Sequence, residues 1–169
     1  MADGPSYHLA YRRRREGKTD YKRRLALLKS RMPRAVVRKS LSGTTVQIVD
    51  YSPEGDRVLA QANYTDLRKM GWKFSVKDTT ATYLTGLLAG KRAISANISE
   101  AVLDIGLNEP VKGSKVFTAL KGLIDAGMEI PHGEEIFPGD ERISGGWRND
   151  EGFSTAFEEI KTKIMEASE

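Results

Sequence analysis

Four consecutive arginines, Arg12 to Arg15, are the residues in this sequence best suited to a specific chemical task. A guanidinium group is planar and has five N–H donors, so it can bind phosphate oxygens in pairs and can stack on nucleobases. Tyr7, Tyr11 and Tyr21 are interleaved with these and the following basic residues. Aromatic rings among cations suit the unstacked bases of folded RNA. The pattern predicts an RNA-binding segment, although Tyr21 fits equally well as an anchor that holds a helix to the rest of the chain.

The charge of the chain is distributed unevenly along its 169 residues. The formal net charge is only +4, from 27 Lys and Arg against 23 Asp and Glu. Residues 1–40 nevertheless carry 13 basic and three acidic residues, a net charge of +10. Residues 41–130 are neutral overall, and residues 131–169 have a net charge of −6. This asymmetry predicts a basic arm that binds a polyanion, a nearly neutral body and an acidic end.

The composition excludes several other classes of function. The chain has no Cys and two His, which excludes disulfides and thiolate metal sites, so we expect no metal ion and no cofactor. There is no run of about 18 apolar residues, so we expect no membrane-spanning helix. No apolar signal segment follows Met1, which favours a cytoplasmic protein. Zinc-finger, basic-zipper and helix-turn-helix patterns are missing, so DNA is not an expected partner.

The basic segment is predicted to contain one regular element. Residues 1–18 are expected to be irregular and to order on binding, because adjacent like charges repel one another. Asp20 follows Thr19 as a helix N-cap, and Pro33 is expected to end the helix. The apolar residues of this helix recur on one face, which is predicted to dock on the body: Tyr21, Leu25, Leu28 and Met32.

The remaining sequence predicts an α/β fold with a single mixed sheet, formed by an antiparallel meander followed by helix–strand–helix, with helices packed on it. We divide the chain into a basic N-terminal arm and helix (residues 1–32), an α/β RNA-binding body (33–130), and a loop with an acidic C-terminal helix (131–169). The expected elements are strands near residues 35–40, 44–51 and 57–63, a helix over 78–97, a strand over 101–106, a helix over 113–127, a loop over 128–150 and a helix from about Asp150 to Ala167.

One segment, Gly86 to Arg92, is similar to a phosphate-binding loop. A Walker loop needs four residues between its glycines and a Ser or Thr after the Lys, whereas here three residues intervene and Arg92 follows Lys91. The segment also lies in a helical pattern, so its small residues are interpreted as sites of close helix–sheet packing. Lys91 and Arg92 could still reach a phosphate from the helix surface.

No catalytic constellation stands out, so we do not expect an enzyme. The acidic residues occur as neighbouring pairs that do not converge on one point, and no nucleophile-elbow pattern is present. Two alternatives to RNA binding stay open. One is a nucleotide-binding protein that uses Gly86 to Arg92, and the other is a protein-interaction module that uses the acidic residues 131–169.

The basic segment and several motifs of the body resemble the L-eighteen family of the archaeal large ribosomal subunit, which is related to the eukaryotic 5S rRNA-binding large-subunit protein. The resemblance covers roughly residues 5–147. The similar motifs are YRRRREGKTDY at residues 11–21, RLALLK at 24–29, PR at 33–34, YLTGLLAG at 83–90, VLDIGL at 102–107, GSKVF at 113–117 and DAGMEIPH at 125–132.

The resemblance implies a structural protein that binds 5S rRNA, attaches it to 23S rRNA in the central protuberance of the large subunit, and lies close to ribosomal protein L-five and other central-protuberance proteins. After Ser40 the family usually has Asn and a basic residue, whereas here Leu41, Ser42 and Gly43 follow. Together, the residue pattern and the resemblance predict RNA contacts by Tyr11, Arg12, Arg13, Arg14, Arg15, Lys18, Tyr21, Lys22, Arg23, Arg24, Arg31, Arg34, Arg38, Lys39, Ser40, Lys91 and Arg92.

Overall fold

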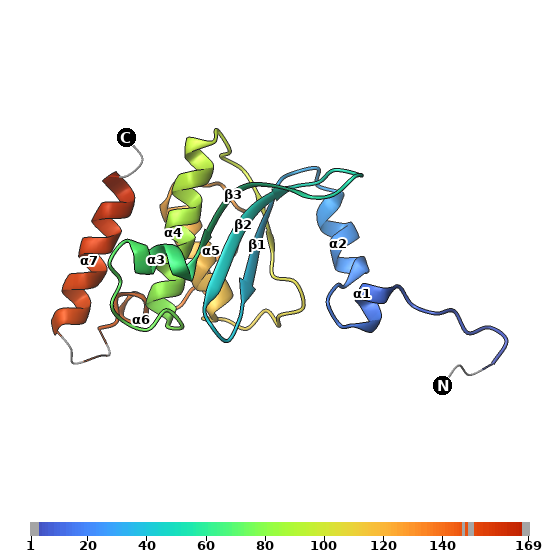
Figure 1. Cartoon of the computed structure of the whole chain (residues 1–169), viewed down its shortest axis with the longest axis horizontal. Coiled ribbons are helices and arrows are strands. Elements are labelled where there is room, and N and C mark those ends of the chain that lie inside the picture. The colour runs from blue at the N-terminus through green and yellow to red at the C-terminus, as the bar shows by residue number, and fades with distance from the viewer. Residues whose placement is uncertain (1–3, 147, 149–150, 167–169) are drawn as a thin grey trace.

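The structure is a computed structural model that describes residues 4–146, 148 and 151–166 (Figure 1). Its N-terminal segment contains two short helices, α1 (Arg12–Arg15) and α2 (Tyr21–Leu28). The later elements are β1 (Arg34–Lys39), β2 (Thr44–Asp50), β3 (Arg57–Asn63), α3 (Tyr64–Lys69), α4 (Thr79–Ser95), β4 (Val102–Asp104), α5 (Lys115–Asp125), the 3-10 helix η1 (Glu134–Ile136), α6 (Asp140–Ser144) and α7 (Glu151–Glu166).

The four strands form one mixed sheet in the order β3-β2-β1-β4. β1 pairs antiparallel with β2, and β2 pairs antiparallel with β3, while β4 runs parallel to β1. In this register Val37 of β1 lies opposite Val46 of β2, and both side chains are fully buried on the same face. The single mixed sheet and the α/β class predicted from the sequence are therefore confirmed.

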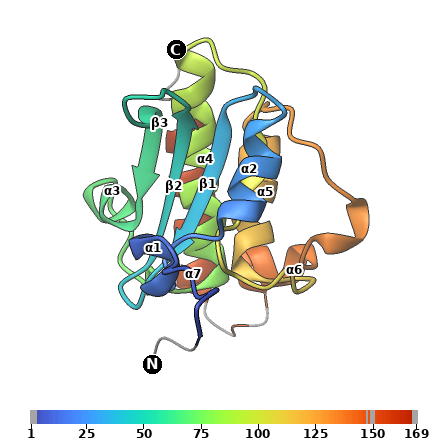
Figure 2. The same ribbon diagram turned by 90° about the vertical axis from the view of Figure 1, so that its right-hand side faces the viewer.

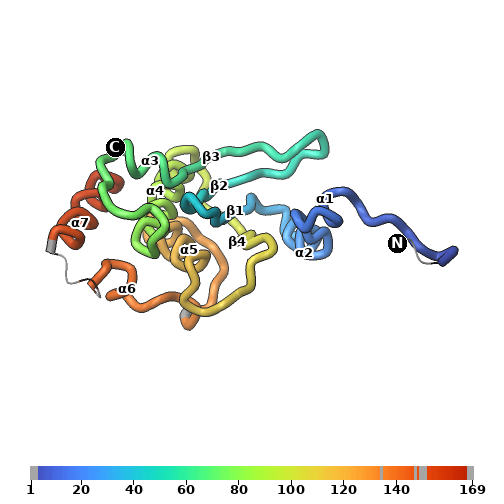
Figure 3. The backbone as a smooth tube through the Cα atoms, turned by 60° about the horizontal axis from the view of Figure 1, so that its bottom comes forward, coloured from blue at the N-terminus to red at the C-terminus, as the bar shows by residue number. Residues whose placement is uncertain are grey.

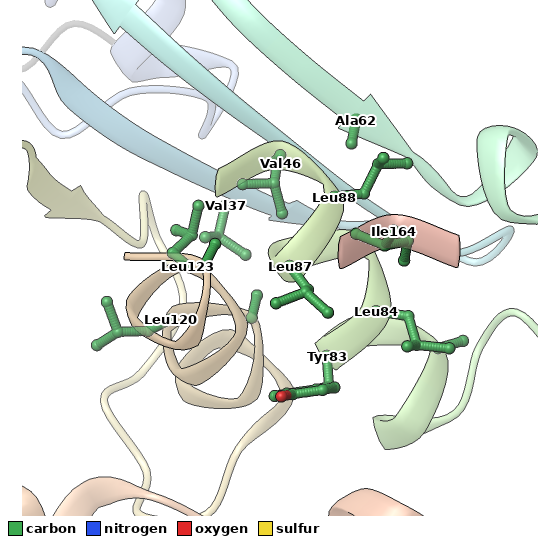
Figure 4. Packing of buried hydrophobic residues seen from close by; sticks show 14 of the residues in the cluster. Val37, Val46, Ala62, Tyr83, Leu84, Leu87, Leu88, Leu120, Leu123 and Ile164 are labelled. Atoms are coloured by element: carbon green, nitrogen blue, oxygen red, sulfur yellow. The ribbon is translucent and has the colours of Figure 1, made fainter. Parts of the chain in front are cut away.

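Helices α4 and α5 cover this buried face of the sheet, and α7 packs against the outer side of α4 (Figures 1 and 2). The core forms where apolar residues of the strands meet one side of each helix. Figure 4 shows Val37 and Val46 of the sheet beside Leu87 of α4 and Leu123 of α5. Ile164 of α7 is also fully buried, so the C-terminal helix belongs to the same core.

Glycines allow α4 and α5 to approach each other closely. A Cβ atom on Gly86 of α4 would lie 2.2 Å from the backbone oxygen of Ala119, and one on Gly122 of α5 would lie 2.3 Å from the backbone oxygen of Tyr83. The small residues of α4 were expected to pack on the sheet. The glycines instead face a second helix, because α4 shares one face of the sheet with α5.

Several boundaries differ from the sequence expectations. The strand expected over 101–106 is shorter, and the loop expected over 128–150 contains η1 and α6. Helix α3 was not predicted. It begins with a capping box in which the Asn63 side chain accepts from the backbone N–H of Asp66, while the Asp66 carboxylate accepts from the backbone N–H of Asn63. The ends expected for the last helix, Asp150 and Ala167, lie outside the described residues.

Helix α2 lies on the opposite face of the sheet from α4 and α5 and runs antiparallel to β1 (Figures 1 and 2). The N-cap prediction is confirmed, since the Asp20 carboxylate accepts hydrogen bonds from the backbone N–H groups of Lys22 and Arg23. The helix ends at Leu28, before the predicted stop at Pro33.

The prediction that the apolar stripe of α2 docks on the body is wrong for Tyr21 and Leu25, which are 37% and 58% exposed, whereas Leu28 and Met32 of the same stripe are half-buried. The side of α2 that faces the sheet carries Arg24 and Leu27, both half-buried. The sheet presents the charged residues Arg34 and Asp104 to this helix. The docked side of α2 therefore includes an arginine that forms an ion pair, and the stripe that begins at Tyr21 and Leu25 turns away from the body.

Candidate nucleic-acid interface

The basic arm occupies one end of the molecule. Figure 1 places α1 and α2 at one end of the long axis and α7 at the other, and Figure 3 shows the same separation from a second direction. The charge asymmetry of the sequence is therefore an asymmetry in space. A polyanion that approaches the N-terminal end meets the basic segment far from the acidic C-terminal helix.

The arm carries far more cations than carboxylates. Residues 4–32 contain ten Lys and Arg residues but only two acids, Glu16 and Asp20. Glu16 contacts Lys18 at 2.9 Å and Arg12 at 3.6 Å, while Asp20 lies 3.5 Å from Arg23. All these pairs lie at the surface, where ion pairs are weak and exchange readily with other anions. The exposed cations of the arm are Arg12, Arg13, Arg14, Arg15, Lys18, Lys22, Arg23, Lys29 and Arg31.

The arginine block forms one turn of helix, so the expectation of an irregular segment is wrong for Arg12 to Arg15. The turn is held by its own backbone, with the N–H groups of Arg15 and Glu16 donating to the carbonyls of Tyr11 and Arg12. The Nε of Arg13 also donates to the Thr19 hydroxyl at 2.8 Å. These local bonds offset part of the repulsion between the four guanidinium groups.

Two tyrosines accompany these cations. The rings of Tyr11 and Tyr21 lie 5.2 Å apart between centroids at an interplanar angle of 59°. Tyr11 is 74% exposed and Tyr21 is 37% exposed, so the alternative in which Tyr21 is a core anchor is not what the structure shows. The pair offers aromatic surface beside guanidinium groups, which is the combination that unstacked bases bind.

A network of five charged side chains joins the arm to the body. Asp56, in the β2–β3 turn, accepts hydrogen bonds from Arg24 and Arg34, each at 2.7 Å. Asp104 of β4 accepts from Arg34 at 2.8 Å and from Arg38 at 3.0 Å. Arginines and aspartates therefore alternate from α2 through the sheet, and this arrangement fixes the position of α2.

The electrostatics of the two aspartates follow from these contacts. Burial alone would raise the pKa of Asp104, but the charge and hydrogen bonds of Arg38, with donors from Gly106 and Arg34, hold this pKa below its ordinary value. Burial acts on Asp56 in the same way and is outweighed by Arg24 and Arg34, so the pKa of Asp56 is also lowered. Both carboxylates are therefore ionised at neutral pH.

The two arginines of β1 differ in their availability for RNA. Arg34 is only 2% exposed and is bound by two carboxylates, so it cannot be the surface contact that the sequence predicted. Its strand is covered by α2, which sequence periodicity did not reveal. Arg38 is exposed along about half of its side chain, although its guanidinium also donates to the backbone oxygen of Asp104 at 2.8 Å. Arg38 therefore stays a candidate contact, and Arg34 is structural.

The turn after β1 exposes one cation and one apolar side chain. Lys39 is exposed, and Leu41 is exposed over 91% of its surface. The hydroxyl of Ser40 donates to the Gly43 carbonyl at 3.0 Å and accepts from the backbone N–H groups of Ser42 and Gly43. Because these bonds engage the hydroxyl, Ser40 holds the turn and is not free to contact RNA in the way that the sequence predicted.

The remaining predicted cations, Lys91 and Arg92, are not brought together with the arm. They lie on α4, on the opposite face of the sheet from α2 (Figure 2). Arg92 binds the Asp66 carboxylate at 2.8 Å and the Gln61 backbone oxygen at 2.6 Å. The whole segment from Gly86 to Arg92 is helical, so its backbone amides do not form a phosphate-binding loop.

The structure shows no sign of a metal site or a membrane span within the residues it describes. Residues 4–146, 148 and 151–166 contain no group of three or more His, Asp or Glu placed to hold a metal ion. In the same part of the chain, none of the helices combines the length and apolarity needed to cross a bilayer.

Sequence reasoning missed the two aspartates that organise this end of the molecule. Asp56 sits in a turn and Asp104 in a short apolar strand, and neither was assigned a role. A signal was available in β1, where Arg34 and Arg38 alternate with the buried residues Ala35 and Val37. Ala35 and Val37 show that one face of this strand is buried. If the opposite face is covered as well, the arginines on it require acidic partners on neighbouring elements.

Comparisons with known proteins identify the family of this sequence. The sequence matches the family described as "Ribosomal large subunit proteins 60S L5, and 50S L18" over residues 5–99 and 95–133. Large ribosomal subunit protein uL18 of Aeropyrum pernix is 56% identical over 144 residues, which are 85% of this chain and 67% of the relative. The uL18 protein of Methanothermobacter thermautotrophicus is 50% identical over 145 residues, which are 86% of this chain and 76% of the relative. The residues that match include both the basic arm and the body, and the chain belongs to this family of structural proteins of the large ribosomal subunit.

Proposed function

We propose that this chain binds 5S rRNA and attaches it to 23S rRNA in the central protuberance of the large subunit, beside ribosomal protein L-five. The observation that carries the proposal is the arm, which combines ten cations and two carboxylates with the tyrosine pair Tyr11 and Tyr21 at one end of the molecule. This arrangement supplies charge for phosphates and rings for unpaired bases. Membership in a family of large-subunit proteins supports RNA as the polyanion.

We propose a different role for each of three parts of the chain. Residues 1–32 form the RNA-binding arm, residues 33–130 form the body that carries Arg38 and Lys39, and residues 131–169 add an acidic helix on the far side. The contacts now proposed are the cations and tyrosines of the arm together with Arg38 and Lys39. Lys91 and Arg92 would require a second RNA segment on the opposite face of the sheet.

A salt titration of 5S rRNA binding tests this proposal. The log of the affinity should fall linearly with the log of the salt concentration, with a slope of about −0.7 to −0.9 for each phosphate contact. Deleting residues 1–18 should reduce both the affinity and the slope. The described residues 4–18 include no buried side chain, so the body should stay folded, which circular dichroism can check. Equal binding by the truncated and full chains would contradict the proposal.

A further inference from the structure

A cleft separates the arm from the end of the sheet. It has a volume of about 360 Å³. Helices α1 and α2 and the loop between them line one side, and Arg38 of β1, the end of β4 and the residues that follow it, up to Pro110, line the other. Binding pockets for small ligands begin at about 300 Å³. The cleft is therefore large enough for one nucleotide and too small for a duplex.

The cleft has an apolar part. Leu27 of α2 and the residues Leu103 and Ile105 at the end of β4 line it, and all three are only half-buried. Aliphatic surface that stays in contact with water is unfavourable by about 25 cal/mol for each Å². A flat ring that covers these side chains would remove that cost.

The rim of the cleft is cationic. Arg13, Lys18 and Arg23 line it from the arm, and Arg38 lines it from the body. The carboxylates of Asp20 and Asp104 also line the cleft, and they are paired with Arg23 and Arg38 respectively. Arg13 is oriented by the bond from its Nε to the Thr19 hydroxyl, and within the described residues its two terminal nitrogens make no hydrogen bond to the protein. A guanidinium that is held at one nitrogen and open at the other two is prepared to bind an anion in a bidentate manner.

Gly106 shapes the body side of the cleft. Its φ is +62°, and a Cβ at this position would lie 2.9 Å from Cζ of Arg38. Glycine therefore lets the Arg38 side chain lie against the backbone, where it donates to the Asp104 oxygen. The cleft is kept open on this side because Arg38 is held along its wall.

From this arrangement we infer that the cleft binds a single unpaired nucleotide of the RNA, with the base against Leu27, Leu103 and Ile105 and the phosphate on the cations of the arm. The inference rests on the proposed function and adds the class of nucleotide that the site takes. An acidic peptide would satisfy the cations but would leave the aliphatic lining uncovered, whereas a nucleotide matches both. A free mononucleotide has the same chemistry as a nucleotide within RNA, so the test must separate these two sources.

A matched pair of variants in α2 tests the aliphatic half of the site. Leu27→Ala removes a side chain that lines the cleft, and Leu25→Ala makes the same change on the outer side of the same helix. We expect Leu27→Ala to weaken 5S rRNA binding roughly ten-fold with an unchanged salt slope, because no phosphate contact is lost. We expect Leu25→Ala to have a clearly smaller effect. Equal effects of the two variants, or none, would overturn the inference.

A photo-crosslinking amino acid in place of Pro110, at the rim of the cleft, locates the nucleotide even if Leu27→Ala is unstable. Crosslinks to one unpaired nucleotide of 5S rRNA support the inference, and removing that base should then cost the full chain as much as Leu27→Ala does. Crosslinks spread along a duplex, or to protein only, would overturn the inference while RNA binding itself persists.

Binding of AMP separates a free nucleotide from a nucleotide within RNA. AMP alone should not saturate the protein at micromolar concentration. If it did, the ligand would be a free nucleotide. A chain that bound no RNA at all would refute both this inference and the proposed function.

Discussion

The guanidinium of Arg34 donates a hydrogen bond of 2.8 Å to the carboxylate of Asp104, and both side chains are buried between α2 and the sheet. The same arginine binds Asp56 at 2.7 Å, and Asp56 in turn binds Arg24 of the arm. The Nε of Arg34 has no hydrogen-bond partner among the described residues. The position of the arm therefore depends on a buried charge with two partners, Asp104 on β4 and Asp56 in the β2–β3 turn, of which Asp56 also binds α2.

Replacing Asp104 should destabilise the fold strongly. Asp104→Asn removes the negative charge that balances the positive charges of Arg34 and Arg38. Removing one partner of a buried ion pair costs about 3–5 kcal/mol. We expect the free energy of unfolding in urea at pH 7 to fall by roughly 3 kcal/mol. Glu54→Gln also removes one negative charge, but at an exposed position in the β2–β3 turn. This control should change the free energy of unfolding by less than about 0.5 kcal/mol.

The same carboxylate should make stability depend on pH. Because the pKa of Asp104 is lowered in the folded chain, its contribution is complete above the ordinary aspartate pKa of 3.8 and is lost as the pH falls below that value. Wild-type stability should therefore fall more steeply between about pH 4 and pH 2 than that of Asp104→Asn. Parallel curves for the two proteins would show that the Asp104 network contributes no pH dependence.

Arg24 should hold α2 against the body. The helix has no buried residue, so loss of the bond between Arg24 and Asp56 should release it while the core stays intact. Hydrogen exchange of the α2 amides should accelerate in Arg24→Ala, with the protection of α4 unchanged. Arg23→Ala is the control, since within the described part of the chain Arg23 pairs with Asp20 at the start of its own helix and with no residue of the body. Similar acceleration in both variants would mean that helix propensity, and not docking, had been changed.

A double-mutant cycle can measure this contact. The pair is partly exposed, so we expect a coupling free energy between Arg24→Ala and Asp56→Asn of about 1 kcal/mol. The coupling should weaken as salt is added, because the side chains are accessible to screening ions.

The helix pair α4–α5 should be intolerant of larger side chains. In Gly122→Ala the new methyl group would lie 2.3 Å from the Tyr83 oxygen, so the helices must move apart. We expect a loss of about 1–3 kcal/mol in the free energy of unfolding. Gly133→Ala, where no atom lies within 4 Å of the new methyl, should change it by less than about 0.5 kcal/mol.

Replacing Arg12 to Arg15 with lysine separates geometry from charge. The variant keeps four positive charges but loses the planar forks and the stacking surface. We expect discrimination between 5S rRNA and a random RNA of equal length to fall, while the salt dependence of binding stays similar. Unchanged discrimination would show that the block acts only through its net charge.

The sequence predicted those features of the fold that arise from local pattern. The strand near 44–51 was marked by β-branched residues and a strong turn at its end, and α4 and α5 by long apolar periodicity, so all three were predicted correctly. Helix α3 was missed because six residues are too few for a helical period to repeat. The capping box formed by Asn63 and Asp66 could have identified it.

The orientation of the arm could not be predicted from periodicity. The stripe that begins at Tyr21 and Leu25 is a regular helical pattern, and only the tertiary structure shows that these two residues are exposed. The opposite side of α2 docks because Arg24 meets Asp56, a residue more than 30 positions away in the sequence. The same long-range pairing buries Arg34, which an alternating strand pattern would leave at the surface.

Nuclease protection of 5S rRNA by the full chain and by a chain that lacks residues 1–18 tests the central claim most directly. If the arm lies on the RNA, the full chain should protect a defined set of nucleotides, and the truncated chain should lose protection at most of them while its body stays folded. Identical protection by both chains, or no protection by the full chain at concentrations where it binds, would contradict the account.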